Sequence, residues 1–152
     1  MLALPDVRLA VPQQARMIAE LSRDTIEHGL AWSWTPARVL RAIRDPSTNV
    51  AVILKRDIVR AFGIMQYGDD SAHLALLAVH PTRRHQGLGA HLVNWLEQSA
   101  RIAGTTQIRL EARADNRAAI AFYQRLGFTQ SGRVTGYYEG TVDAVQLEKR
   151  LA

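Results

Sequence analysis

Two glycines and a cluster of basic side chains lie where an apolar segment gives way to a helical pattern. Residues 79–90 read VHPTRRHQGLGA. The first turn of a helix leaves up to four backbone N–H groups unpaired, and glycine lets an anion approach them closely. Arg83 and Arg84 add positive charge. This segment predicts a phosphate-binding turn, although short glycine patterns are also common in ordinary turns between secondary-structure elements.

Two well-known phosphate motifs do not fit this turn. The dinucleotide-binding pattern requires a third glycine three residues after the second, and that position is Leu92. The P-loop requires Gly-Lys-Ser or Gly-Lys-Thr, and the chain contains neither tripeptide.

The elements on either side of the turn form a recognisable unit. Residues 73–79 are nearly all apolar, as expected of an inner strand covered on both faces. Residues 87–103 carry an apolar stripe at helical spacing that stops at Gly104, and 106–113 alternate between apolar and polar side chains. Strand, helix and strand within about forty residues predict two parallel strands joined by a right-handed crossover.

The rest of the chain supplies further short elements. We expect further strands over residues 7–10, 50–54, 58–66, 128–137 and 141–151, and further helices over 12–28, 36–45 and 117–126. No repeat, linker or shift in composition divides the sequence. We therefore expect one mixed α/β domain over 1–152, built around a sheet of six or seven strands.

Composition limits the chemistry. The 152 residues are 47% apolar and 22% charged, which is ordinary for a globular domain. The absence of cysteine excludes a thiol nucleophile, a disulfide and a thiolate metal site. The five histidines show no pair at metal-ligand spacing, so we expect no metal. The longest apolar run, 74–79, is far too short to span a membrane, and the first residues lack a signal-peptide pattern, so we expect a cytoplasmic protein.

The charge is positive and localised. The net charge is +5, and 81–133 alone hold eight arginines against three acidic residues. Such a block favours an anionic partner, which could be a nucleic acid, an acidic protein or a phosphorylated cofactor.

Two blocks of this sequence resemble the GCN5-related N-acetyltransferase (GNAT) family. Arg84-x-x-Gly87-x-Gly89 is similar to the family's acetyl-CoA signature at this junction of strand and helix. Residues 116–128, NRAAIAFYQRLGF, resemble its Asn-x-x-Ala-x-x-x-Tyr-x-x-x-Gly-Phe block. The resemblance covers about 74–128. It implies a GNAT-like fold whose parallel strands, 74–80 and 106–112, splay apart.

The resemblance implies acetyl-CoA as co-substrate. Main-chain groups at the end of the first parallel strand would pair with the pantetheine arm. Backbone N–H groups of the turn, with one arginine, would hold the pyrophosphate. The implied binding residues are Leu77, Ala78, Val79, Arg84, His85, Gln86, Gly87, Leu88, Gly89 and Asn116. Asn116 could equally be a plain helix cap.

The resemblance also implies an acid and a base. Tyr123 occupies the family's general-acid position, although it shares an apolar stripe with Phe122 and could be a simple packing residue. Glu111 resembles the base of the branch that acetylates ribosomal-protein alanine. The alternative is that Glu111 is a surface carboxylate paired with Arg109 or Arg113.

Three aromatic residues are candidates for contact with the acceptor. Trp32 and Trp34 lie in the loop between the first two helices. The resemblance implies that this loop lines the acceptor pocket, but both tryptophans could instead anchor the core. Tyr137, in a Tyr-Tyr pair before the last strand, resembles a pair in the ribosomal-protein branch.

We therefore expect direct acetyl transfer from acetyl-CoA to a primary amine, either a protein N-terminus or a small molecule, with no acyl-enzyme and no metal. An α-amine costs about 3.5 kcal/mol less to deprotonate at neutral pH than a lysine, which favours the first acceptor weakly. We expect no nucleic-acid or membrane partner, and a homodimer is possible by analogy. The alternatives are a non-catalytic CoA-sensing module and a basic nucleic-acid-binding domain.

Overall fold

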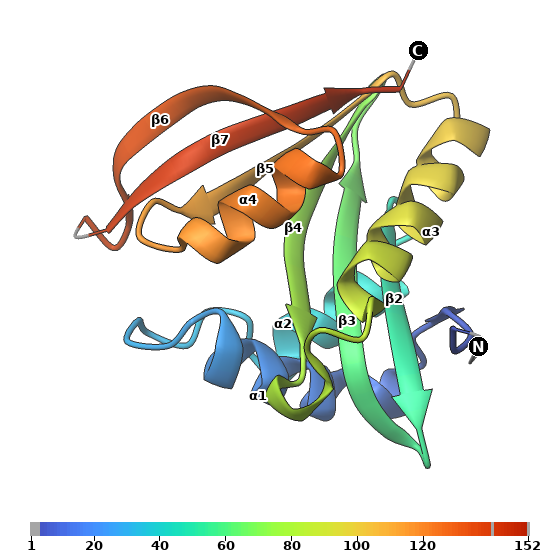
Figure 1. Ribbon diagram of the computed structural model, residues 1–152. Coiled ribbons are helices and arrows are strands. Elements are labelled where there is room, and N and C mark those ends of the chain that lie inside the picture. Colours follow the sequence, from blue (N-terminus) through green and yellow to red (C-terminus); the bar gives the residue numbers. More distant parts are fainter. Residues whose placement is uncertain (1–3, 141, 152) are drawn as a thin grey trace.

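The computed structural model describes residues 4–140 and 142–151, which fold around one twisted sheet (Figure 1). In that part of the chain the sheet has seven strands in the order β1-β2-β3-β4-β5-β7-β6. The strands are β1 (Arg8–Leu9), β2 (Thr48–Lys55), β3 (Ile58–Tyr67), β4 (Ser71–Val79), β5 (Gln107–Arg113), β6 (Thr129–Tyr138) and β7 (Val142–Arg150). The helices are α1 (Ala15–Thr25), α2 (Pro36–Arg44), α3 (Leu88–Ile102) and α4 (Arg117–Arg125), with 3-10 turns at Pro12–Gln14 and Pro81–Arg83.

Helices cover both faces of the sheet. One core joins α3 and α4 to side chains such as Leu74 and Leu110, and the other joins α1 and α2 to side chains such as Leu76. Strand β4 contributes to both cores, as its apolar sequence predicts. Because Leu110 faces α3 and α4, the alternating polar residues of β5, including Glu111, point to the α1–α2 face.

The two central strands run parallel but pair only briefly. The β4–β5 ladder contains three pairs, and its last is His73 with Arg109. In the β3–β4 ladder, Leu74 and Leu76 pair with consecutive residues of β3, so Ala75 has no partner there. Such a bulge bends a strand and increases its twist. Beyond this point β4 stays paired with β3, and β5 stays paired with β7. We call the separating segments, 74–79 and 110–113, the β4–β5 fork (Figure 1).

The mixed α/β architecture and the parallel crossover are confirmed. The first helix is shorter than predicted, because the chain leaves the helix after Thr25 and the side chain of Glu27 turns inward. The predicted start of the last strand at Thr141 lies outside the described residues. Within the described part of the chain, no helix is long and apolar enough to span a membrane.

Candidate active site

The phosphate-binding turn predicted from sequence follows β4 directly. His85 and Gly87 both have left-handed backbones, with φ of 64° and 78°, and Gly87 is the N-cap of α3 without a side-chain hydrogen bond. A left-handed backbone there turns the chain sharply into the helix, whose first N–H groups have no partner within the helix itself. Residues 84–87 are all exposed to solvent. This geometry fits an anion at the turn.

The two arginines of the turn, Arg83 and Arg84, differ in their exposure to solvent. The Arg84 side chain is exposed, whereas the Arg83 Nε atom is buried and has no hydrogen-bond partner among the described residues. A buried donor without a partner costs free energy until an acceptor reaches it. Arg83 therefore also fits a bound anion, and it is the last residue of the 3-10 turn that follows β4.

The two sequence blocks meet at the start of α3. The Phe122 ring of α4 packs beside Gly89, where a Cβ atom would lie 3.1 Å from Phe122 Cζ. The Asn116 side chain caps α4 by accepting a hydrogen bond from the Ala119 N–H at 3.0 Å. Gly89 is therefore needed for the contact between the two helices, whatever it does for a ligand.

Glu111 lies just past the last β4–β5 pair, and its shortest contacts are with side chains of other strands. Its Oε1 atom is 2.6 Å from His73 Nε2 and accepts a hydrogen bond of 3.2 Å from the Tyr137 hydroxyl. Of the two arginines considered as its partners, Arg109 forms a longer ion pair, 3.8 Å from Oε2 of Glu111, and Arg113 pairs with Asp115 instead. The Glu111 side chain is only 9% exposed. The hydrogen bond with His73 is the largest cause that lowers the Glu111 pKa, so this carboxyl is ionised at neutral pH.

Sequence reasoning missed His73. A signal was present, because His73 is the one titratable residue in the apolar run 73–79 and parallel pairing brings that position beside β5. A polar residue at the beginning of an otherwise apolar inner strand, next to a carboxylate on the neighbouring strand, is the pattern that could have identified it.

Tyr123 lies on the opposite side of β5 from Glu111. It is 8% exposed and packs edge-on against Phe122 and Phe128. Burial raises the pKa of its phenol strongly, so the hydroxyl keeps its proton. A neutral phenol is a proton donor.

The loop between α1 and α2 is organised by a buried carboxylate. Oε1 of Glu27 accepts hydrogen bonds from Ser33 N and Oγ, at 2.7 and 2.8 Å, and from Trp34 N at 3.1 Å, while Ser22 donates to Oε2. Trp34 is buried in the α1–α2 core, with the Arg38 guanidinium 3.8 Å above its ring. Trp32 is half-buried and donates to the Ala19 carbonyl. The core role left open for both residues is thus the one their surroundings favour.

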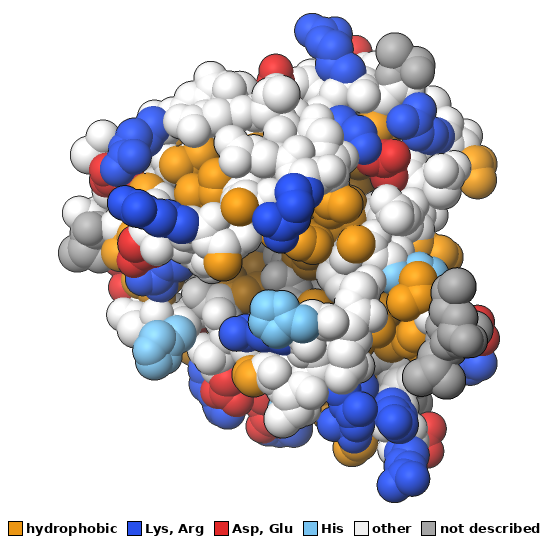
Figure 2. Space-filling view, in the orientation of Figure 1, with side chains coloured by type: hydrophobic (Ala, Val, Ile, Leu, Met, Phe, Trp, Pro, Cys, Tyr) orange, Lys and Arg blue, Asp and Glu red, His pale blue; other side chains and the backbone are white. Residues whose placement is uncertain are grey.

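Two hydrogen bonds connect this loop to the strands around Glu111. The Ala31 N–H donates to Glu139 at the tip of the β6–β7 hairpin, and Arg113 donates to the His28 carbonyl. Tyr137, 47% exposed, lies on the same hairpin. The surface is hollowed between α4 and the region of α1 and the turn after β4, with hydrophobic side chains inside and basic side chains at its margin (Figure 2).

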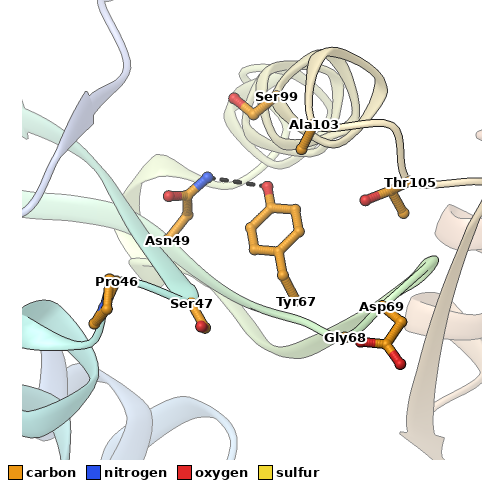
Figure 3. A pocket seen from close by; sticks show the side chains of 9 residues that line it. All are labelled: Pro46, Ser47, Asn49, Tyr67, Gly68, Asp69, Ser99, Ala103 and Thr105. Atoms are coloured by element: carbon orange, nitrogen blue, oxygen red, sulfur yellow. Dashed lines mark hydrogen bonds between the residues drawn. The ribbon is translucent and has the colours of Figure 1, made fainter.

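A second hollow lies elsewhere, between β2, β3 and the end of α3 (Figure 3). Its polar lining includes Asn49, whose amide donates to the Tyr67 hydroxyl at 2.9 Å. It contains none of the residues predicted for the site. Among the described residues, no group of three or more His, Cys, Asp or Glu side chains could hold a metal ion.

A sequence model of the acetyltransferase (GNAT) family matches residues 15–128, and the chain belongs to this family. It is 40% identical over 88 residues to the ribosomal protein bS18-alanine N-acetyltransferase of Escherichia coli, a match that covers 56% of this chain and 60% of that relative. The chain thus matches about three fifths of the length of this curated relative.

Two solved structures are similar over nearly the whole chain. The crystal structure of the ribosomal-protein-S18-alanine N-acetyltransferase from E. coli has a TM-score of 0.84 and 25% identity, and the match covers 97% of this chain and 94% of that one. An aminoglycoside 6'-N-acetyltransferase complexed with coenzyme A has a TM-score of 0.80 and 20% identity, with 97% of each chain covered. The second likeness concerns the fold alone.

Proposed function

We propose that this chain, as one domain over 1–152, transfers the acetyl group of acetyl-CoA directly to a primary amine. The observation that carries the proposal is the β4–β5 fork, with an ionised, nearly buried Glu111 where the strands part. The fork opens next to the left-handed turn before α3. One site thus combines a strand edge, an anion-binding turn and a proton acceptor.

The co-substrate would lie along the open edge of β4. The pantetheine arm would pair with main-chain groups of Leu77, Ala78 and Val79, as an added strand does. The pyrophosphate would bind the N–H groups of 85–89, with Arg84 and the buried Nε of Arg83 as charged partners. A main-chain N–H near Leu77 would polarise the thioester carbonyl, and one such donor is typically worth about 3 kcal/mol in the transition state.

The reaction moves two protons. An ammonium acceptor gives one proton to the Glu111 carboxylate, and the free nitrogen lone pair then forms the C–N bond with the carbonyl carbon. The C–S bond breaks and sulfur leaves with the electron pair. The sulfur takes a proton from the Tyr123 hydroxyl, and the second nitrogen proton restores that phenol. The proton on Glu111 is released to water.

The acceptor is proposed to be the α-amine of a protein chain. The relative at 40% identity, named for acetylation of an alanine in a ribosomal protein, supports this choice. A small-molecule amine is the second candidate, because the aminoglycoside enzyme shares the fold. The α-amine needs a weaker base than a lysine, which suits a carboxylate of lowered pKa.

The test measures thiol release from acetyl-CoA with a panel of peptides and small amines. We expect Glu111→Gln to lower kcat by about 10²–10⁴-fold while acetyl-CoA binding is retained. Glu148→Gln is the matched control, because Glu148 lies on β7 and bonds Gln107 away from the fork. Binding of acetyl-CoA without any acetylated product over the whole panel would instead favour a CoA-sensing module.

A further inference from the structure

We propose that His73 is a positioning residue for acetyl transfer, and that its protonation state controls the basicity of Glu111. This inference rests on the proposed function and adds a residue to it. The active form is a neutral His73 that donates one hydrogen bond to an ionised Glu111. A doubly protonated His73 would hold the same carboxylate in an ion pair and weaken it as a base.

The geometry fixes the pair at one point of the fold. His73 belongs to the last pair of the β4–β5 ladder, and Glu111 lies two residues beyond its partner Arg109. The 2.6 Å contact between His73 Nε2 and Glu111 Oε1 therefore bridges the two strands at the place where they separate. Their side chains are 20% and 9% exposed, so water screens the contact only weakly.

The hydrogen-bond partners determine where the ring proton lies. An ionised carboxylate only accepts, so Nε2 must carry the proton in the contact with Glu111. Nδ1 lies 3.4 Å from the Gln66 side-chain oxygen, on the strand opposite His73 in the β3–β4 ladder. An amide can turn either its oxygen or its NH₂ group toward Nδ1, so Gln66 can serve both the charged and the neutral ring.

The other groups facing the pair do not supply this switch. Arg109 from β5 lies 3.8 Å from Oε2 of Glu111, and Tyr137 from β6 donates to Oε1, the oxygen that His73 contacts. Burial raises the phenol pKa of Tyr137, and that of the neighbouring Tyr138 to about 12. Both phenols therefore stay neutral in the range where a histidine ordinarily titrates, between about pH 5 and 8. Because the two groups are coupled, the pair and not Glu111 alone sets the acidic limb of activity.

The kinetic test compares His73→Gln with wild type in pH profiles of kcat at saturating acetyl-CoA and acceptor. Glutamine can still donate to Glu111 but cannot gain a second proton. We expect its kcat near the optimum to stay within about threefold of wild type and its acidic limb to move to lower pH by about one unit. The ionisation of the acceptor affects both enzymes equally. The difference between the two pH profiles therefore measures the contribution of the His73–Glu111 pair.

Two further variants separate this role from a purely structural one. His73→Leu removes the donor and is expected to lower kcat at least tenfold at every pH, with KM for acetyl-CoA unchanged. His91→Gln on α3 is the matched control, since the His91 ring bonds the Pro5 carbonyl near the start of the chain, and this variant should leave the profile unchanged. An acidic limb that stays in place in His73→Gln would overturn the proposal.

A readout without activity keeps the inference separate from the proposed function. Nitrogen NMR of the wild-type imidazole should show the Nε2–H tautomer above neutral pH, and Glu111→Gln should reduce that preference. A wild-type ring in the Nδ1–H tautomer would refute the pairing even in an active enzyme. The expected tautomer in a protein that acetylates nothing would instead refute only the proposed function.

Discussion

The Phe122 ring of α4 occupies the space that a side chain at Gly89 of α3 would need. A Cβ atom there would lie 3.1 Å from Phe122 Cζ and 3.6 Å from Val79 Cγ2. The absence of a side chain at residue 89 therefore lets the end of β4, the start of α3 and the middle of α4 pack together. This contact joins the two sequence blocks in space.

Replacing Gly89 by alanine should strain this contact. Overpacking of this kind typically costs about 1–3 kcal/mol, so we expect Gly89→Ala to lower the free energy of unfolding by that amount. The same substitution in a Phe122→Leu background should cost at least 0.5 kcal/mol less, which is the coupling expected of touching residues. Urea unfolding of the four proteins of this cycle measures the coupling, and strict additivity would contradict the contact.

The second prediction concerns the carboxylate that organises the α1–α2 loop. Glu27→Ala leaves the Ser33 and Trp34 amides without their acceptor, and each unsatisfied buried group costs about 1–3 kcal/mol. We expect lower stability and a several-fold higher KM for the acceptor, since this loop bonds the hairpin that carries Tyr137. The KM for acetyl-CoA should change little. Glu20→Ala on α1 is the control.

The third prediction follows from the tyrosines. All four, Tyr67, Tyr123, Tyr137 and Tyr138, have phenol pKa values raised first of all by burial. A group with a raised folded-state pKa stabilises the fold below its unfolded pKa and loses that contribution as the pH rises further. We therefore expect stability to fall above about pH 10, the ordinary phenol value.

Phenolate absorbance during an alkaline titration measures this directly. At about pH 10 the native protein should show well under the half-ionisation expected of free tyrosine, and addition of denaturant should raise the signal. Tyr123→Phe should leave less stability to be lost at high pH. Half-ionisation of the native protein at the ordinary value would show that these phenols are not buried as described.

A fourth prediction concerns an ion pair that joins three elements away from the fork. Lys149 of β7 lies 2.8 Å from Glu97 of α3 and also donates to the Leu126 carbonyl at the end of α4. Lys149→Met leaves the nearly buried Glu97 without this partner, so we expect a loss of about 1–3 kcal/mol. After Lys149→Met, Glu97 keeps its longer ion pair of 3.5 Å with Arg101. Adding Glu97→Leu should recover part of that loss, because it removes the nearly buried carboxylate that has lost its closest partner. Thermal unfolding of the single and the double variant measures whether the double variant is the more stable of the two.

The fold was largely predictable because local signals agreed with each other. Thr35 and Pro36 predict the start of α2, and the structure shows that Thr35 caps it. The apolar run, the glycine turn and the alternating segment predict β4, α3 and β5, and these elements form the parallel unit expected. Arg56 and Asp57 form the tight turn between β2 and β3, both with positive φ.

What sequence reasoning missed depends on side chains that meet across the fold. The sequence indicates the same-strand neighbour Arg109 as a partner of Glu111, and the two form an ion pair of 3.8 Å. The shorter contact is with His73, which lies on the neighbouring strand and 38 positions away. Glu27 falls in a segment predicted to be helical, and only the structure shows that its carboxylate turns back to hold the following loop. Arg83 was distinguished from Arg84 only by burial. Spacing alone carries no information on such contacts.

The position of the fork has a consequence for what can enter it. Unpaired strand edges normally lie at the rim of a sheet, where a foreign strand can add to them and start aggregation. Here the free edge of β4 lies inside the sheet, with paired strands on both sides and helices over both faces. A single extended chain could pair with this edge from within the sheet, whereas the edge strand of another sheet would first have to displace the neighbouring strands and helices. The unpaired backbone groups of β4 thus lie away from the rim of the sheet, where pairing between copies of a chain would start.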